Sequence, residues 1–231
     1  MVNETPLVTA VIPVWNCERY LAEAIDSVLA QDYPAVDLLV VDDGSTDNSA
    51  AIAKSYGGSL RYLYQENTGL AGAQNTGYRE ARGEFVAYLD SDDLWLPGKI
   101  SRQMDVFRET PELDIVFAHV EQFHSPDIPD LLDQQPPPAM AGIHTGCMLA
   151  RRDVFERVGP FDTEITLGEF LDWYARAQDA GIKVRVLDDI MLRRRIHDRN
   201  MGLQEKNKRA DYLRVFKASL DRRRKLQQQG D

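Results

Sequence analysis

Apolar and amphipathic segments alternate through the first half of this chain of 231 residues. The runs that predict strands are residues 7–12, 37–41, 60–65 and 84–89, and the segments that predict helices are 18–31, 46–55 and 70–82. In segment 18–31, apolar residues recur three and four positions apart, the spacing of one helix face. Such alternation is typical of βαβ units around a mostly parallel sheet. We therefore expect an α/β fold, with Pro13 ending the first strand.

The second half is less regular. It predicts strands at 115–123, 146–151 and 183–187 and helices at 153–158 and 169–180. Residues 125–141 contain five prolines and predict a loop, either a mobile rim over a cleft or an insertion. Because we find no repeat and no linker, we expect one domain over 1–204, followed by a tail over 205–231.

The tail is basic, although the whole chain carries a formal net charge of −10. Residues 206–225 contain nine Lys or Arg and two Asp, with Leu213, Phe216 and Leu220 at helical spacing. We expect a basic C-terminal helix that docks on the domain, with peripheral membrane contact as the alternative. The acidic remainder argues against nucleic-acid binding.

Cys17 and Cys147 show no metal or redox spacing, as expected in a reducing compartment. No apolar run approaches the roughly 20 residues needed to span a bilayer. The first residues lack the basic and apolar regions of a signal peptide. These features predict a soluble, cytoplasmic protein.

Three carboxylates, Asp90, Asp92 and Asp93, directly follow the predicted strand 84–89. Crowded acids at a strand end repel one another, so a hard divalent cation such as Mg²⁺ or Mn²⁺ is their natural neutraliser. Alternatively, Ser91 or Asp92 caps a helix that begins near Leu94.

Polar or aromatic groups also follow the first two predicted strands, at 13–16 and at Asp42–Asp43. In parallel α/β sheets, functional groups gather at the carboxyl ends of the strands. We therefore expect segments 13–16, 42–43 and 90–92 to converge on one crevice.

Five motifs then occur in a characteristic order: VIPVWN at 11–16, VVDDGSTD at 40–47, ENTG at 66–69, NTG at 75–77 and LDSDD at 89–93. Together they resemble family-two inverting glycosyltransferases of the GT-A fold, a single Rossmann-like domain. The resemblance implies metal-dependent transfer of a sugar, with inversion, from a nucleoside-diphosphate sugar. It leaves the acceptor open among glycans, lipids, peptides and small molecules.

The same resemblance assigns the donor contacts. Asp42 accepts from a ring N–H of the base, for which uracil is the expected choice, and Pro13 and Trp15 form the wall beside it. The residues that the resemblance places on the nucleotide sugar are Pro13, Trp15, Asn16, Asp42, Asn67, Gly69, Asn75, Asp90, Ser91, Arg194 and Arg195.

The metal site implied by the resemblance has Asp92 as a direct ligand and Asp90 as an assisting one. The segment RRRIHDRN at 193–200 resembles a C-terminal signature whose histidine, here His197, completes that site. Arg194 and Arg195 would then offset the charge of the leaving diphosphate, or belong to a solvated basic face. Asp93 is either a supporting group or a helix cap.

The chain departs from the family pattern at two positions. Gln74 stands where many relatives carry Arg, and Phe170 stands where the catalytic aspartate would fall. Glu169, at the start of a predicted helix, is the nearest remaining carboxylate and is the preferred general base. Asp172 is the second candidate, although its spacing also allows an ion pair with Arg176.

Two other functions fit parts of this pattern. The departures at Gln74 and Phe170 are compatible with a relative that binds a nucleotide sugar without turning it over. A metal-dependent nucleotidyltransferase would use the same acids, but the segment 13–16 lacks the glycine and Lys of its usual phosphate loop.

Overall fold

The computed structural model of the chain describes residues 5–126, 135–198, 200 and 217. The predicted boundary at residue 204, the docking residues of the tail and part of the proline-rich segment lie outside this range. Lys217 is in helical conformation.

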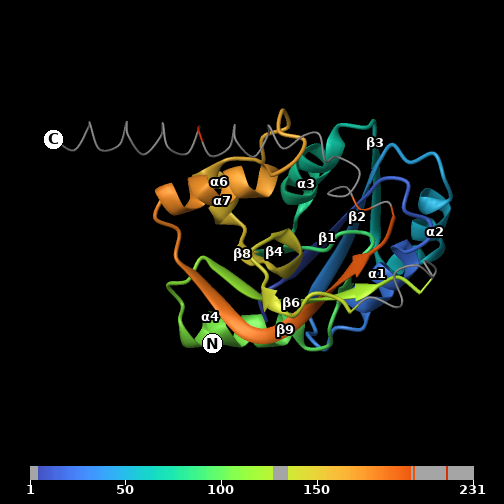
Figure 1. Cartoon of the computed structure of the whole chain (residues 1–231). Helices are drawn as coiled ribbons and strands as arrows, with labels where there is room; N and C mark the ends of the chain where they lie inside the picture. Colours follow the sequence, from blue (N-terminus) through green and yellow to red (C-terminus); the bar gives the residue numbers. More distant parts are fainter. Residues whose placement is uncertain (1–4, 127–134, 199, 201–216, 218–231) are drawn as a thin grey trace.

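One mixed sheet occupies the centre of the molecule (Figure 1). Its strands are β1 (Val8–Val14), β2 (Val36–Asp43), β3 (Arg61–Gln65), β4 (Phe85–Tyr88), β5 (Leu94–Trp95), β6 (Ile115–His124), β7 (Met140–Ala141), β8 (Leu149–Arg151) and β9 (Val184–Ile196). They are ordered β3-β2-β1-β4-β8-β6-β9-β5, and β7 pairs with β6. The first four strands are mutually parallel, and β8 is antiparallel to β4.

Helices pack on the sheet and connect its strands. They are α1 (Leu21–Leu29), α2 (Ser49–Ser55), α3 (Gly69–Glu80), α4 (Lys99–Glu109), α6 (Asp153–Val158) and α7 (Glu169–Asp179), with short 3₁₀ turns at Gly57–Ser59 and Thr145–Cys147. In Figure 1, α3, α6 and α7 lie above the sheet and α4 lies below it. The expected α/β fold with a mostly parallel sheet flanked by helices is therefore confirmed.

The central position of β1 explains its apolar sequence. All seven of its residues are buried, because β2 and β4 pair with its two edges while helices cover its faces. Pro13 does not end this strand, contrary to prediction. Pairing with β4 stops at Val11, and beyond it only β2 continues alongside, so the missing N–H of Pro13 costs little.

Three further predictions were wrong in their details. No helix begins near Leu94, because Leu94 and Trp95 pair with β9 and the next helix, α4, starts at Lys99. The start of the strand predicted at 146–151 is a 3₁₀ turn. The last strand runs to Ile196 rather than residue 187, because β6 pairs with it over most of this length.

Candidate functional site

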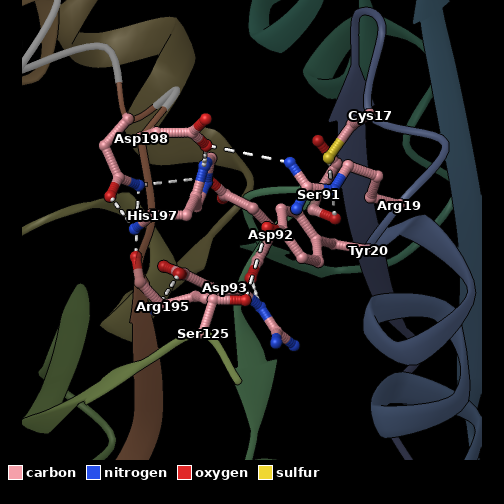
Figure 2. A network of polar contacts seen from close by, with 11 residues as sticks. Cys17, Arg19, Tyr20, Ser91, Asp92, Asp93, Ser125, Arg195, His197 and Asp198 are labelled. Carbon is pink, nitrogen blue, oxygen red and sulfur yellow. Dashed lines mark hydrogen bonds and ion pairs between the residues drawn. The ribbon is translucent and has the colours of Figure 1, made fainter. Parts of the chain in front are cut away.

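The acids that follow β4 meet the end of β9. Asp92 and His197 are 105 residues apart in sequence, and Asp92 Oδ2 lies 2.9 Å from His197 Nε2 (Figure 2). His197 is almost completely buried, with its ring 4.8 Å from that of Tyr20. Asn200 accepts from the main-chain N–H of His197 at 2.7 Å and lies 3.4 Å from Asp92 Oδ2. The structure thus brings together the two residues expected to bind the metal.

Asp93 and Arg195 support this pair from inside the protein. Asp93 Oδ1 accepts from the main-chain N–H of Arg195 at 2.8 Å, so Asp93 caps no helix. The Arg195 side chain, 2% exposed, donates to the carbonyl oxygen of Asp92 and to Glu23. These contacts leave Arg195 facing the protein interior, whereas Arg194 is exposed.

The surroundings of the Asp90 carboxyl disfavour its charged form. Its Oδ1 is buried without a hydrogen-bond partner among the described residues. Burial raises the pKa of its carboxyl to about 7, reinforced by the negative charges of Asp92 and Glu169 and opposed by Arg194. The adjacent Ser91 accepts from the Cys17 thiol through its main-chain oxygen at 3.4 Å.

Glu169 begins α7 and lies within electrostatic range of Asp90. It is 9% exposed, and burial raises the pKa of its carboxyl against the lowering effect of main-chain N–H groups at Gly168 and Glu169. Gly168 precedes the helix with φ of 93°, a conformation that favours glycine. The turn therefore places the N-terminus of a helix, with the Glu169 carboxylate, within electrostatic range of Asp90.

The neighbours of Glu169 on α7 are used structurally. Asp172 pairs with Arg176 Nε at 2.9 Å, and Arg176 also donates to the main-chain oxygens of Val158 and Pro160. Phe170, which the sequence pattern predicts to stand where the family has an aspartate, packs against Phe117, Trp173 and Tyr174 in the aromatic core. That position therefore belongs to the hydrophobic core in this chain.

The carboxylates that follow β2 are held by protein donors. Asp42 is completely buried and accepts from Ser45 N at 2.8 Å and from the Tyr62 hydroxyl at 2.6 Å. Asp43 accepts from the main-chain N–H groups of Thr68 and Gly69 at the start of α3. These bonds fix the turn of the VVDDGSTD motif, including the turn contact that was the structural alternative for Asp42.

The end of β1 presents an exposed aromatic ring. Trp15 is 60% exposed, whereas Pro13 is buried within the sheet. Asn16 adopts a left-handed φ of 50°, and its side-chain oxygen accepts from Thr46 N at 2.7 Å. The first two strand ends are thereby joined, and Trp15 is left with a free face beside them.

The residues expected near the ribose and phosphates differ in their surroundings. Asn67 is exposed and donates to the Asp43 carbonyl, and Gly69 has a positive φ of 79°. Asn75 instead is buried, with both its amide atoms bonded to the main chain of Phe161 at 2.9 and 2.8 Å. Gln74 is completely buried, and neither atom of its amide has a partner within the described part of the chain.

The residues present fit a divalent cation. Two ligands at right angles, each about 2.1 Å from Mg²⁺ or Mn²⁺, lie about 3 Å apart, close to the 2.9 Å between Asp92 Oδ2 and His197 Nε2. The buried Oδ1 of Asp90 has no partner among the described residues. No larger group of three His, Cys, Asp or Glu side chains arranged for a metal occurs in the described residues.

Sequence reasoning missed the residues that hold this pair. Tyr20 and Glu23 were expected only as part of a helix, and Asn200 had no role. Asn200 lies three residues after His197, a spacing at which an Asn side chain can bond back to the main chain of a turn. Tyr20 and Glu23 carried no comparable signal, because their contacts with Arg195 span about 170 residues.

Solved structures show the same fold in other proteins. S. aureus TarS 1–349 matches with a TM-score of 0.68 at 21% identity, over 82% of this chain and 60% of that one. The mannosyltransferase PcManGT from Pyrobaculum calidifontis, solved with GDP-Man and Mn²⁺, matches with a TM-score of 0.70 at 20% identity, over 95% and 65%. These similarities establish the GT-A fold.

Sequence comparison identifies relatives of this chain that are named as glycosyltransferases. An uncharacterised glycosyltransferase of Rickettsia typhi is 32% identical over 209 residues, which are 84% of this chain and 65% of the relative. The present chain therefore spans about two thirds of the length of that relative. In the described part, the structure contains no helix with the length and apolar character needed to cross a membrane.

The family model described as glycosyl transferase family 2 matches residues 9–159, most of the chain and all five motifs. Together with the GT-A sheet and the acids at its strand ends, this match shows that the chain belongs to glycosyl transferase family 2.

Proposed function

We propose that this protein transfers a sugar, with inversion, from a nucleoside-diphosphate sugar to an acceptor, using a divalent cation. The observation that carries the proposal is the 2.9 Å approach of Asp92 to His197, near Asp90 with its buried Oδ1. Family membership and the GT-A fold support the same reaction class.

In this proposal, Asp92 and His197 hold Mg²⁺ or Mn²⁺, assisted by Asp90. The cation would supply Lewis-acid stabilisation of the leaving diphosphate. Arg194 is exposed and lies within electrostatic range of Asp90, so it can add positive charge on the solvent side. Arg195 is removed from this role because its guanidinium bonds to Asp92 and Glu23.

The acceptor side depends on Glu169. Inverting transfer needs a base that removes the acceptor proton during in-line attack. Glu169 lies at a helix N-terminus, where main-chain N–H groups stabilise its ionised form, and it is near enough to Asp90 to affect that group. Asp172, the second candidate, is engaged by Arg176.

The base of the donor is proposed to lie against Trp15, with uracil as the expected base. TarS has been solved with UDP-GlcNAc, whereas PcManGT has been solved with GDP-Man. Because proteins of this fold have been solved with donors of both bases, side chains near Trp15 would determine which base this chain binds. Asp42 is already bonded to Ser45 and Tyr62, and a ring N–H would have to share those acceptor oxygens.

The test is metal-dependent release of nucleoside diphosphate. The full chain would be incubated with Mn²⁺, a panel of UDP- and GDP-linked sugars and a mixed panel of glycan, lipid, peptide and small-molecule acceptors. We expect release with one donor class, its loss on adding EDTA, and its loss in Asp92→Ala. NMR of the product should show the anomeric configuration opposite to that of the donor.

Other outcomes would reject this proposal in distinct ways. Undiminished transfer by Asp92→Ala would eliminate the metal mechanism. Calorimetric binding of a nucleotide sugar without turnover across the panel would indicate a non-catalytic binding protein. Release of pyrophosphate would indicate a nucleotidyltransferase.

A further inference from the structure

Asp92 and His197 come from segments distant in sequence, and a short antiparallel pairing aligns them. β5 pairs with β9 so that Leu94 lies opposite Arg193 and Trp95 opposite Leu192. Continuing the same antiparallel register two residues beyond the Leu94–Arg193 pair places Asp92 opposite Arg195. The ladder of β5 itself contains only two residues, so other bonds must extend it toward the metal pair.

Side-chain bonds of Arg195 and Asp93 provide this extension. Where a regular strand would bond main chain to main chain, Arg195 N donates to Asp93 Oδ1 at 2.8 Å. Arg195 Nε donates to the main-chain oxygen of Asp92 at 2.9 Å. On the other side, the Arg195 carbonyl accepts from Asn200 Nδ2 at 3.1 Å, and Asn200 holds the main chain of His197. Arg195 therefore contacts the supports of both metal-binding residues.

The guanidinium of Arg195 is itself fixed in position. It lies between two aromatic rings, with its carbon 4.6 Å from the centre of the Tyr20 ring and 4.7 Å from that of Phe123. Its remaining end donates to Glu23 Oε2 at 2.8 Å, on α1. Figure 2 shows Arg195, His197 and Tyr20 grouped around Asp92. The planar fork can serve Asp92 and Glu23 together, which a lysine ammonium at the same place cannot do.

We propose that Arg195 is a positioning residue for the cation: its fork between Asp92 and Glu23, and its main-chain bonds to Asp93 and Asn200, set the spacing of Asp92 and His197. This inference rests on the metal site of the proposed function. It assigns Arg195 and Arg194, adjacent in sequence, to different tasks. Arg194 acts on the donor, whereas Arg195 acts only through the geometry of the two ligands.

The test measures Mn²⁺ binding directly, because free Mn²⁺ gives an EPR signal that is lost on binding. Full-length wild type, Arg195→Lys and Glu23→Gln would each be titrated with Mn²⁺ alone. Groups that orient metal ligands typically change affinity by about 10- to 100-fold, so we expect about tenfold weaker binding in Arg195→Lys. Glu23→Gln should weaken binding a few-fold, because it removes the negative charge that holds one end of the Arg195 fork and leaves a neutral amide oxygen as the acceptor.

Arg193→Lys is the matched control. Arg193 lies on the same strand, stacks on the same Phe123 ring at 4.4 Å and pairs with Glu121, but it touches neither metal-binding residue. The Arg193→Lys variant should bind Mn²⁺ with the same affinity as wild type. Thermal unfolding of all variants separates positioning from stability, and Glu23→Gln should fold normally because the Glu23 side chain is 58% exposed.

The outcomes distinguish this inference from the function on which it rests. If wild type binds Mn²⁺ and the Arg195→Lys and Glu23→Gln variants bind it equally well, the positioning role is wrong and the metal site stands. The same holds if Arg193→Lys weakens binding as much as Arg195→Lys. If wild type does not bind Mn²⁺ in the same titration, both the positioning role and the proposed metal site are wrong.

Discussion

Gln74 and Gln103 are both completely buried, yet their surroundings are opposite. Gln103, on α4, donates to the carbonyls of Val116 and Cys147 and accepts from Lys99. Gln74, on α3, has no partner for either amide atom within the described residues. Buried polar groups are almost always paired. Gln103 follows this rule, because both atoms of its amide have hydrogen-bond partners. The unpaired amide of Gln74 is a group that a ligand or water can satisfy.

The same contrast recurs among the acids. Asp43 accepts from two main-chain N–H groups, and Asp172 forms an ion pair with Arg176. Asp90 instead keeps a buried oxygen without a partner among the described residues. Paired groups hold the scaffold, whereas the buried groups without a partner among the described residues include Gln74 on α3 and Asp90 just after β4. This distinction predicts which substitutions change stability and which change chemistry.

The largest expected effect separates Glu169 from Asp172. Glu169→Gln removes the proposed base and should lower the transfer rate by about 10²- to 10⁴-fold, with little change in donor binding. Asp172→Asn removes the partner of Arg176 and should mainly lower the free energy of unfolding. Turnover and urea unfolding of both variants check this. A larger loss of rate in Asp172→Asn, at full folding, would reverse the assignment.

The hydrogen-bonded groups around Gln103 on α4 offer a prediction of pH dependence. Lys99 is completely buried beside Gln103, the Met148 carbonyl and the Trp95 ring, and it forms no ion pair in the described part. Burial lowers the pKa of its ammonium from the usual 10.5 to about 7. Between these values the unfolded chain binds more protons, so stability should rise with pH from about 7 to 10.5, by at most about 1.4 kcal/mol per pH unit.

Urea unfolding at several pH values in this window measures the slope. Lys99→Met removes the titrating group and should flatten the dependence relative to wild type. An unchanged slope in Lys99→Met would show that other groups cause it.

The smallest effect concerns the two glutamines themselves. Gln74→Met removes an unpaired buried amide and should raise the free energy of unfolding of the donor-free protein by about 1 kcal/mol. Gln103→Met leaves Lys99 and the carbonyls of Val116 and Cys147 without their hydrogen-bond partner, and should lower the free energy of unfolding by about 2 kcal/mol. Denaturant unfolding without and with nucleotide sugar checks both. Equal destabilisation by the two substitutions would remove the distinction drawn above.

The sequence predicted the sheet and most helices, because strand and helix periodicity are local signals, whereas the meeting of Asp92 with His197 was implied by the family resemblance. It did not predict the short strand β5, because two residues carry no periodicity. It misassigned Arg195, since three adjacent arginines look alike in sequence, whereas the alternation of side chains along β9 buries Arg195 and exposes Arg194. The equivalence of Phe170 with the family's aspartate stays a prediction, and what the structure adds is that this side chain packs in the aromatic core.

The separation of 105 residues between Asp92 and His197 also bears on biosynthesis. The segment matched by the family model ends at residue 159, before α7 and the end of β9 have been translated. A nascent chain at that stage can form the parallel half of the sheet, because its contacts are shorter in range. The contact between Asp92 and His197 forms only after residue 197 leaves the ribosome, so any site built on this pair is completed later than the parallel half of the sheet.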